Sequence, residues 1–280
     1  MKYIEIKAPA KINFGLNIVS KRNDGYHNLE TIFYPINDLF DVIKIEKSEH
    51  FLFTCSNKEL ESDKNNLILK AVKLLEKIYS KSFAVNIHLE KNIPIGAGLG
   101  GGSSDAAAVL ISLNEMFQLG IKHDQMIDYA LQLGSDVPFF IKAKPAIGTS
   151  RGEVLKQIDF EINYPILIVN PGIHISTKEA FQNIIPKTSL YNYFSNEINE
   201  LKNWDLIQEK ITNDFENFVF EKYPEVKNIK EMIYENGALF SLMSGSGSTV
   251  YGVFENYNAA KKTSDKFSSN YLKIISNQAL

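Results

Sequence analysis

The sequence predicts an α+β protein built from two domains, with residues 1–155 in the first and residues 156–280 in the second. Three observations support this prediction. The chain has 280 residues, which is enough for two ordinary domains with a core each. Its first half alternates short apolar strands with amphipathic helices. Its second half follows the order strand, helix, helix, strand, strand, helix, strand, which is typical of a ferredoxin-like split β-α-β fold.

Four strands are expected in the first half, at 3–8, 12–19, 41–47 and 84–90. In the last of them Val85, Ile87 and Leu89 alternate with polar residues, so one face of that strand is expected to be buried. Cys55, the single cysteine of the chain, lies in another apolar run and is also expected to be a strand residue.

Three helices are expected in the same half, at 65–80, 103–117 and 124–133. Asn65 or Asn66 can accept the first backbone N–H groups of the first helix. Gly120 and Gly134 are expected to end the second and the third, because glycine readily adopts the left-handed conformation that closes many helices.

The second half is expected to contain strands at 164–170, 238–245, 249–256 and 271–276, and helices at 176–184, 224–236 and 258–267. Pro224 stands near the first position of the middle helix, where its missing N–H would have no partner in any case. Residues 187–204 are rich in Asn, Tyr and Ser and are expected to be an insertion or a mobile loop.

Composition and charge exclude several classes of protein. The net charge of −3 offers no electrostatic attraction for nucleic acid. No apolar run of about 18 residues is present, so no membrane-spanning helix is expected, and the first residues do not have the pattern of a secretory signal peptide. A single cysteine cannot form an internal disulfide, which favours a reducing, cytoplasmic location.

A run of small residues at 94–105, with the sequence PIGAGLGGGSSD, carries the strongest chemical signal. Glycines allow backbone N–H groups to approach an anion closely, and the helix that follows adds the positive end of its dipole. The run therefore predicts a phosphate-binding loop. Ser103 or Ser104 can cap that helix, and a hydroxyl there can reach a phosphate or its metal ion. Asp105 would repel phosphate, so it must point away or meet a cation.

Two other glycine-rich loops fit this run less well. A P-loop needs a lysine directly after its last glycine, and here Ser103 follows Gly102. Gly96, Gly98 and Gly101 match the spacing of a dinucleotide-binding fingerprint, but Pro94 separates them from the preceding strand, and no acidic residue follows about 20 residues later. A flexible surface loop does not explain why the run leads directly into an alanine-rich helix.

The run resembles the central motif of the GHMP kinases, the superfamily of galactokinase, homoserine kinase and mevalonate kinase. Residues 8–18, APAKINFGLNI, and residues 243–254, MSGSGSTVYGVF, resemble its N-terminal and C-terminal motifs. The stretches RNDGYHNLETIF at 22–33 and LGSDVPFF at 133–140 are similar to one branch of this superfamily. The resemblance runs in order along essentially the whole chain.

The resemblance implies an N-terminal domain like the second domain of ribosomal protein S5 and a ferredoxin-like C-terminal domain. It also implies a reaction, in which ATP phosphorylates the 2-hydroxyl of a methylerythritol that carries a cytidine diphosphate. ATP would be the co-substrate, with Mg²⁺ as the metal ion. The resemblance leaves the oligomeric state open.

The resemblance assigns the catalytic roles to two residues. Asp136 would accept the proton of the attacking hydroxyl or hold the alcohol in line. Lys11 would orient this aspartate and offset the charge on the attacking oxygen. Without the resemblance, Asp136 is explained as a turn or cap residue and Lys11 as a strand residue whose ammonium reaches solvent. Asn13 lies two residues after Lys11, so both side chains are expected on one face of a strand, where Asn13 can bind substrate.

The ATP-binding residues implied by the resemblance are Pro94, Ile95, Gly96, Ala97, Gly98, Leu99, Gly100, Gly101, Gly102, Ser103 and Ser104, together with Asn66 and Leu67 near the adenine. Ser104 is the candidate metal ligand.

The cytidine diphosphate would be recognised by aromatic and polar residues. Tyr26 and Phe181 would stack on the two faces of the cytosine, and His27 would bind its edge. Thr177 lies four residues before Phe181 and shares a helix face with it, which makes it a further substrate-binding candidate. Judged by pattern alone, Asp24-Gly25 is a hairpin turn followed by core aromatics.

Two alternatives remain open. The nearest is a kinase of the same superfamily with another alcohol substrate, although residues 22–33 are not expected in a mevalonate or homoserine kinase. The other is a nucleic-acid-binding module, because the implied N-terminal fold also occurs in ribosomal proteins. The negative net charge argues against it.

Overall fold

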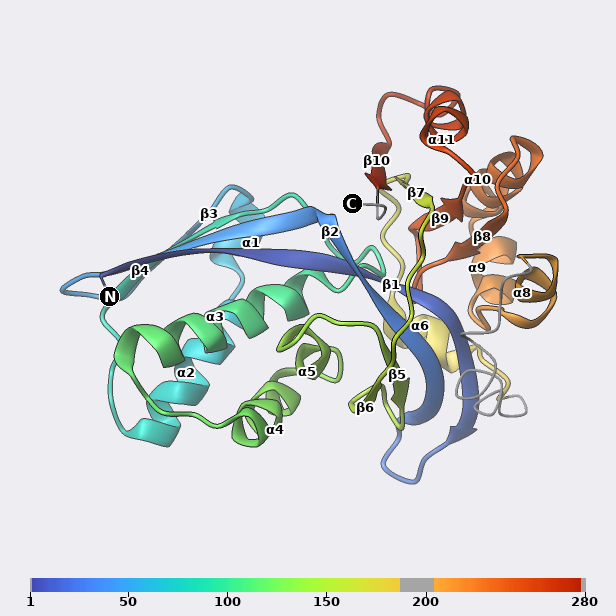
Figure 1. Cartoon of the computed structure of the whole chain (residues 1–280). Coiled ribbons are helices and arrows are strands. Elements are labelled where there is room, and N and C mark those ends of the chain that lie inside the picture. The colour runs from blue at the N-terminus through green and yellow to red at the C-terminus, as the bar shows by residue number, and fades with distance from the viewer. Residues whose placement is uncertain (1, 187–203, 278–280) are drawn as a thin grey trace. The chain divides into compact units, whose positions relative to one another are not determined.

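The computed structural model describes residues 2–186 and 204–277 (Figure 1). The polar stretch predicted at 187–204 therefore lies outside the described residues, apart from Trp204. Contacts divide the chain into two units. Unit 1 contains Met1–Ala10, Leu39–Ile93 and Gly100–Ala143, and unit 2 contains Lys11–Asp38, Pro94–Leu99 and Lys144–Leu280. The domain boundary expected near residue 155 stays a prediction.

Two long strands contribute to both units. β1 spans Tyr3–Lys21 and pairs with β2, which spans His27–Lys47. The sequence predicted two separate strands within β1 and only the last part of β2. Pro9 lies between the two predicted strands and cannot donate a backbone hydrogen bond. The strand continues through it because, among the described strands, β1 pairs with β2 alone, and proline is tolerated on an unpaired strand edge.

Unit 1 combines strands with a layer of helices. Residues Val42–Lys47 of β2 pair antiparallel with β4 (Val85–Glu90), and β4 pairs parallel with β3 (Leu52–Cys55). Figure 1 shows the three longer helices on one side of these strands. They are α2 (Leu67–Tyr79), α3 (Gly101–Phe117) and α4 (His123–Leu133), and two short helices, α1 (Lys58–Ser62) and α5 (Val137–Phe140), complete the unit.

The core of unit 1 confirms the expected periodicities. Val85, Ile87 and Leu89 are buried, and the residues between them are exposed. Helix α2 packs against α3. Cys55 is a buried strand residue, as expected. The expected end of α4 at Gly134 is confirmed.

One helix end differs from the expectation. The backbone turns left-handed at Gln118, with a φ of 54°, so α3 closes two residues before Gly120.

Unit 2 contains one edge of the first sheet and a second sheet, which is ferredoxin-like. Residues Thr31–Phe33 of β2 pair with β5 (Ala146–Thr149), which pairs with β6 (Val154–Gln157). The second sheet has the order β10-β7-β9-β8 with antiparallel pairs throughout. Its strands are β7 (Pro165–Asn170), β8 (Phe240–Met243), β9 (Val250–Val253) and β10 (Leu272–Asn277). This order confirms the ferredoxin-like topology expected from the sequence.

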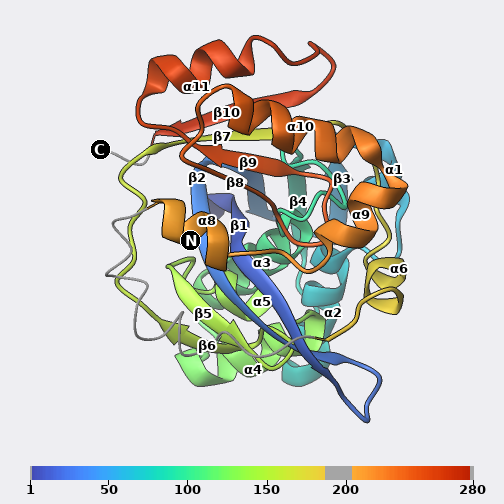
Figure 2. The ribbon, with the colours of Figure 1, turned by 90° about the vertical axis from the view of Figure 1, so that its right-hand side faces the viewer.

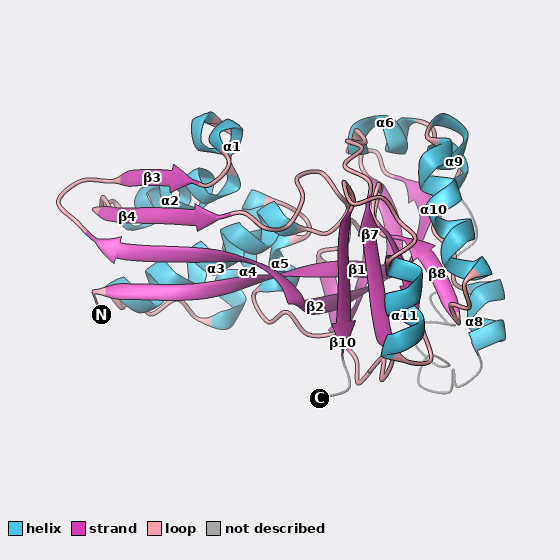
Figure 3. Cartoon of the chain, turned by 90° about the horizontal axis from the view of Figure 1, so that it is seen from above, coloured by secondary structure: helices cyan, strands magenta, loops and turns pink. Residues whose placement is uncertain are grey.

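Helices cover one face of this second sheet. Figures 2 and 3 show α10 (Pro224–Glu235) and α11 (Tyr257–Ser264) lying along it, and both contact its strands. The remaining described helices of the unit are α6 (Thr177–Gln182), α8 (Trp204–Lys210) and α9 (Glu216–Lys222). Buried residues of β7, β9 and α10, such as Leu167, Val250 and Ile229, form the core. Within residues 2–186 and 204–277, no helix is both long and apolar enough to cross a membrane.

Candidate functional site

Lys11 and Asn13 lie together in β1, within unit 2. Both are buried, with 3% and 1% of their surface exposed. The Lys11 Nζ donates to Asn13 Oδ1 and to the Gly98 carbonyl oxygen at 3.1 Å. Asn13 Nδ2 donates to Thr31 Oγ1 at 2.9 Å. The expectation that the two side chains share a strand face is confirmed. Lys11 is not a surface lysine, because its ammonium is bound inside the unit.

Gly98 brings the segment 94–99 against the loop 244–249. A Cβ added at Gly98 would lie 2.0 Å from the Ser244 carbonyl oxygen. Ser244 Oγ donates to the Gly98 carbonyl oxygen at 2.9 Å and accepts from the Asn13 N–H at 3.1 Å. A Cβ added at Gly245 would lie 3.0 Å from the Gly98 Cα. The two glycine-rich motifs therefore meet, and glycine is required where they touch.

The side chain of Asn213 binds the loop 244–249. This residue was not among those predicted from the sequence. Its Nδ2 donates to the carbonyl oxygens of Met243 at 2.7 Å and of Gly245 at 2.8 Å. Its Oδ1 accepts from the Phe215 N–H at 3.0 Å, which leaves this buried amide well bonded. A single asparagine outside any motif gives no local signal of such a role. Thr177, one of the predicted substrate-binding residues, contacts Ser246 of the same loop through its hydroxyl at 2.9 Å.

Of the three residues predicted to bind cytosine, His27 and Phe181 contact each other. The rings of His27 and Phe181 are stacked, with centroids 5.1 Å apart and planes inclined by 20°. Phe181 also packs edge-on against Phe215. Burial lowers the pKa of His27, and the charge of Lys21 adds to this effect. Tyr26 is 53% exposed, and the rings that stack or pack edge-on against Phe181 within the described residues are those of His27 and Phe215.

The glycine run has two parts, residues 94–99 and residues 100–104, which belong to different units. Gly96, Gly98 and Gly100 have positive φ values of 64°, 78° and 73°, so the backbone turns at every second residue. Such alternation directs successive N–H groups to one side, as in anion-binding loops. The Cβ of a residue at Gly96 would lie 2.6 Å from His174 Nδ1, so the His174 ring would have to move to admit it. The first six residues of the run, 94–99, belong to unit 2.

The second part of the run, 100–104, belongs to unit 1 and opens α3. The helix begins at Gly101, two residues earlier than expected, and no side chain caps it. The expectation that Ser103 or Ser104 caps the helix is therefore wrong. The Ser104 hydroxyl is buried and has no hydrogen-bond partner among the described residues. Gly102 is exposed, whereas a Cβ at Gly101 would lie 2.7 Å from Lys91 Nζ.

Asp105 meets a cation, as the sequence required. Lys91 Nζ lies 3.6 Å from Asp105 Oδ2 and also donates to Asp41 Oδ2. Asp41 Oδ1 accepts from the backbone N–H groups of Asn92 at 2.6 Å and Ile93 at 2.8 Å. Asp105 Oδ1 is buried without a partner in the described part of the chain. Burial raises the pKa of Asp105, and the Lys91 charge opposes this only in part. When Asp105 is protonated, Asp41 and Lys91 are the two charged groups of this cluster, and their charges cancel.

We expect the variant Asp105→Asn to be more stable than the wild type at neutral pH. The folded state holds the Asp105 proton more tightly than the unfolded chain, whose aspartates have a pKa of about 3.9. Wild-type stability therefore falls as pH rises from about 4 through the raised pKa, by about 1.4 kcal/mol per pH unit at most, and stays constant above it. The amide does not titrate, so the advantage of the variant should grow across this window, as thermal unfolding at several pH values would reveal.

Asp41→Asn is the matched control, since it removes the charge that pairs with Lys91. It should destabilise the protein, because the buried Lys91 ammonium then keeps only Asp105, at 3.6 Å, as an acidic partner. A stability gain for Asp105→Asn that does not vary with pH would contradict the protonated state of Asp105.

Asn66, Leu67 and Asp136 lie at helix starts in unit 1. Asn66 Oδ1 accepts from the Ile68 N–H at 2.9 Å, so Asn66 and not Asn65 caps α2, and Leu67 is the first residue of that helix. Asp136 is half-buried at the residue before α5. Its side chain makes no capping hydrogen bond with that helix, so capping does not explain this aspartate.

No cluster of metal-ligating side chains gathers in the described part of the chain. Within residues 2–186 and 204–277, no group of three or more His, Cys, Asp or Glu residues could hold a metal ion. The orphaned Ser104 hydroxyl is the one feature of the glycine run that suits a metal ion bound to phosphate, because magnesium prefers oxygen ligands.

Comparisons with known proteins agree along the whole chain. The family profile described as GHMP kinases N terminal domain matches residues 66–144, and that described as GHMP kinases C terminal matches residues 196–273. A 4-diphosphocytidyl-2-C-methyl-D-erythritol kinase of Bacteroides thetaiotaomicron is 44% identical over 255 residues, which cover 88% of this chain and 90% of the relative. The enzyme of the same name from Prosthecochloris aestuarii is 40% identical over 281 residues, with coverages of 97% and 96%.

A solved structure gives the same result. The crystal structure of a 4-(cytidine 5'-diphospho)-2C-methyl-D-erythritol kinase superposes with a TM-score of 0.82 at 30% identity. The superposition covers 97% of this chain and 98% of that chain.

Proposed function

Because the chain belongs to the 4-diphosphocytidyl-2-C-methyl-D-erythritol kinases of the GHMP kinase family, we propose roles for its residues in that reaction. The enzyme transfers the γ-phosphoryl group of ATP to the 2-hydroxyl of 4-diphosphocytidyl-2-C-methyl-D-erythritol, in the non-mevalonate route to isoprenoid precursors. The new bond joins the 2-oxygen to phosphorus, the bond to the β-phosphate oxygen breaks, and ADP leaves. Each role must serve positioning or charge stabilisation, which are the main sources of catalysis in phosphoryl transfer.

ATP binding is assigned to the glycine run. The backbone N–H groups of residues 94–104 contact the triphosphate, and Asn66 and Leu67 border the adenine. The alternating positive φ values at Gly96, Gly98 and Gly100 support this role, as does the start of α3 at Gly101. Gly102 is exposed, and the atom that a Cβ there would meet within 4 Å is Leu67 Cδ1 at 3.9 Å, so a phosphate can approach at this residue.

Mg²⁺ is proposed to accompany ATP, and it would neutralise charge on the phosphates when bound. The described residues offer it the Ser104 hydroxyl and no set of carboxylates. We therefore propose that phosphate oxygens and water supply most of its ligands, as magnesium often retains them.

The phosphoryl acceptor is proposed to be prepared by Asp136, Lys11 and Asn13. Asp136 accepts the proton of the 2-hydroxyl, and Lys11 offsets charge on the attacking oxygen. The hydrogen bonds of Lys11 to Asn13 and to the Gly98 carbonyl support this role, because they fix the position of its ammonium group. A cytoplasmic location remains a proposal based on the single cysteine, Cys55.

Cytosine recognition is assigned to Tyr26, His27 and Phe181, with Thr177 as a further contact. Because His27 covers one face of Phe181, stacking of the base on Phe181 requires the imidazole to turn away. The lowered pKa of His27 favours the neutral ring, which carries one donor and one acceptor for the edge of cytosine.

The experiment that tests this assignment measures ADP release with the cytidyl substrate, mevalonate and homoserine as alternative acceptors. Only the cytidyl substrate should be phosphorylated at a substantial rate. Tyr26→Ala and Phe181→Ala should each raise its KM by about tenfold, because base stacking contributes about 1–3 kcal/mol per base. The KM for ATP should change little. If free CDP inhibits both variants and the wild type equally, the cytosine binds elsewhere, and rapid turnover of mevalonate would favour another GHMP kinase.

A further inference from the structure

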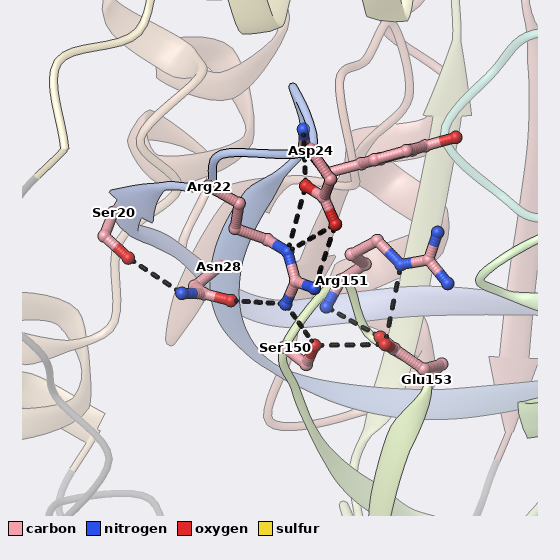
Figure 4. A network of polar contacts seen from close by, with 8 residues as sticks. Ser20, Arg22, Asp24, Asn28, Ser150, Arg151 and Glu153 are labelled. Carbon is pink, nitrogen blue, oxygen red and sulfur yellow. Dashed lines mark hydrogen bonds and ion pairs between the residues drawn. The ribbon is translucent and has the colours of Figure 1, made fainter.

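A second cluster of polar contacts surrounds Tyr26 and is not needed by the roles given above. It joins two turns of unit 2, residues 22–26 between β1 and β2, and residues 150–153 between β5 and β6 (Figure 4). Among the 30 lysine and arginine residues of the chain, only Arg22 and Arg151 are arginines, and both belong to this cluster. Lysine supplies the positive charge everywhere else, so the guanidinium group is used only here.

Arg22 uses the planar geometry of its side chain to join the two turns. Its Nε and Nη2 donate to the Asp24 carboxylate at 3.0–3.2 Å. Its Nη1 donates to Asn28 Oδ1 at 3.0 Å and to Ser150 Oγ at 2.9 Å. The Leu29 N–H donates to the Ser150 carbonyl oxygen at 2.6 Å, which adds a backbone link. A lysine could not make these hydrogen bonds, because it has one ammonium group in place of the planar guanidinium with its several donors.

Arg151 is positioned by the same turns. Glu153 accepts from the Arg151 N–H at 2.7 Å and from Ser150 Oγ at 3.0 Å, and its carboxylate lies 3.5 Å from Arg151 Nε. The guanidinium carbon of Arg151 then lies 4.7 Å from the centre of the Tyr26 ring. Since an ion pair with Glu153 would be satisfied by lysine as well, stacking on Tyr26 is the contact that requires arginine.

The Tyr26 ring has little other support within residues 2–186 and 204–277. The side chain is 53% exposed, and the hydrogen bonds of the residue to Asp24 and Arg22 involve its backbone. A guanidinium on one face of a tyrosine ring restricts its rotation and leaves the other face open. A ring that is ordered before binding loses less conformational entropy when a base stacks on it.

We propose that Arg151 is a positioning residue for substrate recognition, which stacks on one face of Tyr26 and presents the opposite face to the cytosine of the substrate. This inference rests on the proposed role of Tyr26. Arg22 and Glu153 act through it. Arg22 joins the turn that carries Arg151 to the turn that carries Tyr26, and Glu153 orders the turn of Arg151 itself. Arg151 thereby determines affinity for the cytidine moiety and takes no part in phosphoryl transfer.

The test compares Arg151→Met, which keeps the length of the side chain, with Arg151→Lys, which keeps its charge. Arg151→Met should raise the KM for the cytidyl substrate and the Kd for free CDP by about threefold to tenfold, the range expected for loss of a cation–π contact. The kcat at saturating substrate and the KM for ATP should stay within about twofold. Arg151→Lys should fall between Arg151→Met and the wild type.

Lys156→Met is the matched control, since Lys156 is an exposed cation on β6 of the same hairpin. It should leave both constants unchanged. Wild-type KM and CDP affinity in Arg151→Met would overturn the proposal, and so would a loss confined to kcat.

Tyr26→Ala separates this proposal from the one on which it rests. In the Tyr26→Ala protein, Arg151→Met should have no further effect on CDP binding. If Tyr26→Ala weakens CDP binding and Arg151→Met does not, the role of Arg151 is wrong while that of Tyr26 stands. If Tyr26→Ala has no effect on CDP binding, both are wrong.

Discussion

Asp136→Asn should lower the turnover number by about 10² or more and leave the affinity for ATP within about threefold. The amide has the shape of the carboxylate but cannot accept the proton of the 2-hydroxyl. Because the side chain makes no capping bond with α5, the substitution should change the helix start very little. Single-turnover rates with the cytidyl substrate, together with calorimetric ATP titrations, measure the two quantities separately.

Lys11 provides the second half of this prediction. Lys11→Met should slow the same step, and the double variant should be little slower than the slower single variant, since residues that act together in one step are not additive. Asp128→Asn is a suitable control, because Asp128 is an exposed carboxylate on the neighbouring helix α4. Near-normal turnover in Asp136→Asn, or losses that multiply in the double variant, would refute the proposed catalytic pair.

Local patterns in the sequence predicted the elements that depend on local physics. The alternation of β4, the N-terminus of α2 at Asn66 and the end of α4 at Gly134 all follow from residue periodicity and capping. The strand and helix order of the second half predicted the ferredoxin-like sheet, because that topology places its elements in a fixed sequence.

Features that depend on distant partners could not be predicted in this way. Besides β1, strand β2 pairs with β4 and β5, whose partner residues lie far along the chain. The bonds of Asn213 to the loop 244–249 and of Lys91 to Asp41 and Asp105 likewise join segments that no local pattern relates.

The glycine run shows both limits within one motif. The positive φ values of Gly96, Gly98 and Gly100 are a conformation that glycine adopts readily, and the phosphate-binding loop expected from the composition stays a prediction. The sequence attributed every glycine to the approach of phosphate. The structure adds a different reason at Gly98 and Gly101, where neighbouring protein atoms already occupy the space of a Cβ.

Gly98→Ala should therefore be among the most damaging single substitutions in the chain. The added methyl group would lie 2.0 Å from the Ser244 carbonyl oxygen, a backbone atom that cannot move without shifting the loop 244–249. We expect about 3 kcal/mol or more of destabilisation from this overlap, in addition to about 1–2 kcal/mol for an alanine at positive φ. Displacement of the Gly98 carbonyl would also remove a partner of Lys11 Nζ, so turnover should fall together with stability.

Gly172→Ala isolates the cause of this effect. Gly172 has the same φ of 78° as Gly98, but no atom lies within 4 Å of its missing Cβ. Both variants therefore carry the same backbone strain, and only Gly98→Ala carries the overlap. The melting temperature should fall several times further in Gly98→Ala than in Gly172→Ala, and only Gly98→Ala should lose ATP affinity and turnover. Equal losses in the two variants would mean that backbone strain alone, and not the contact between the two glycine-rich motifs, requires glycine at position 98.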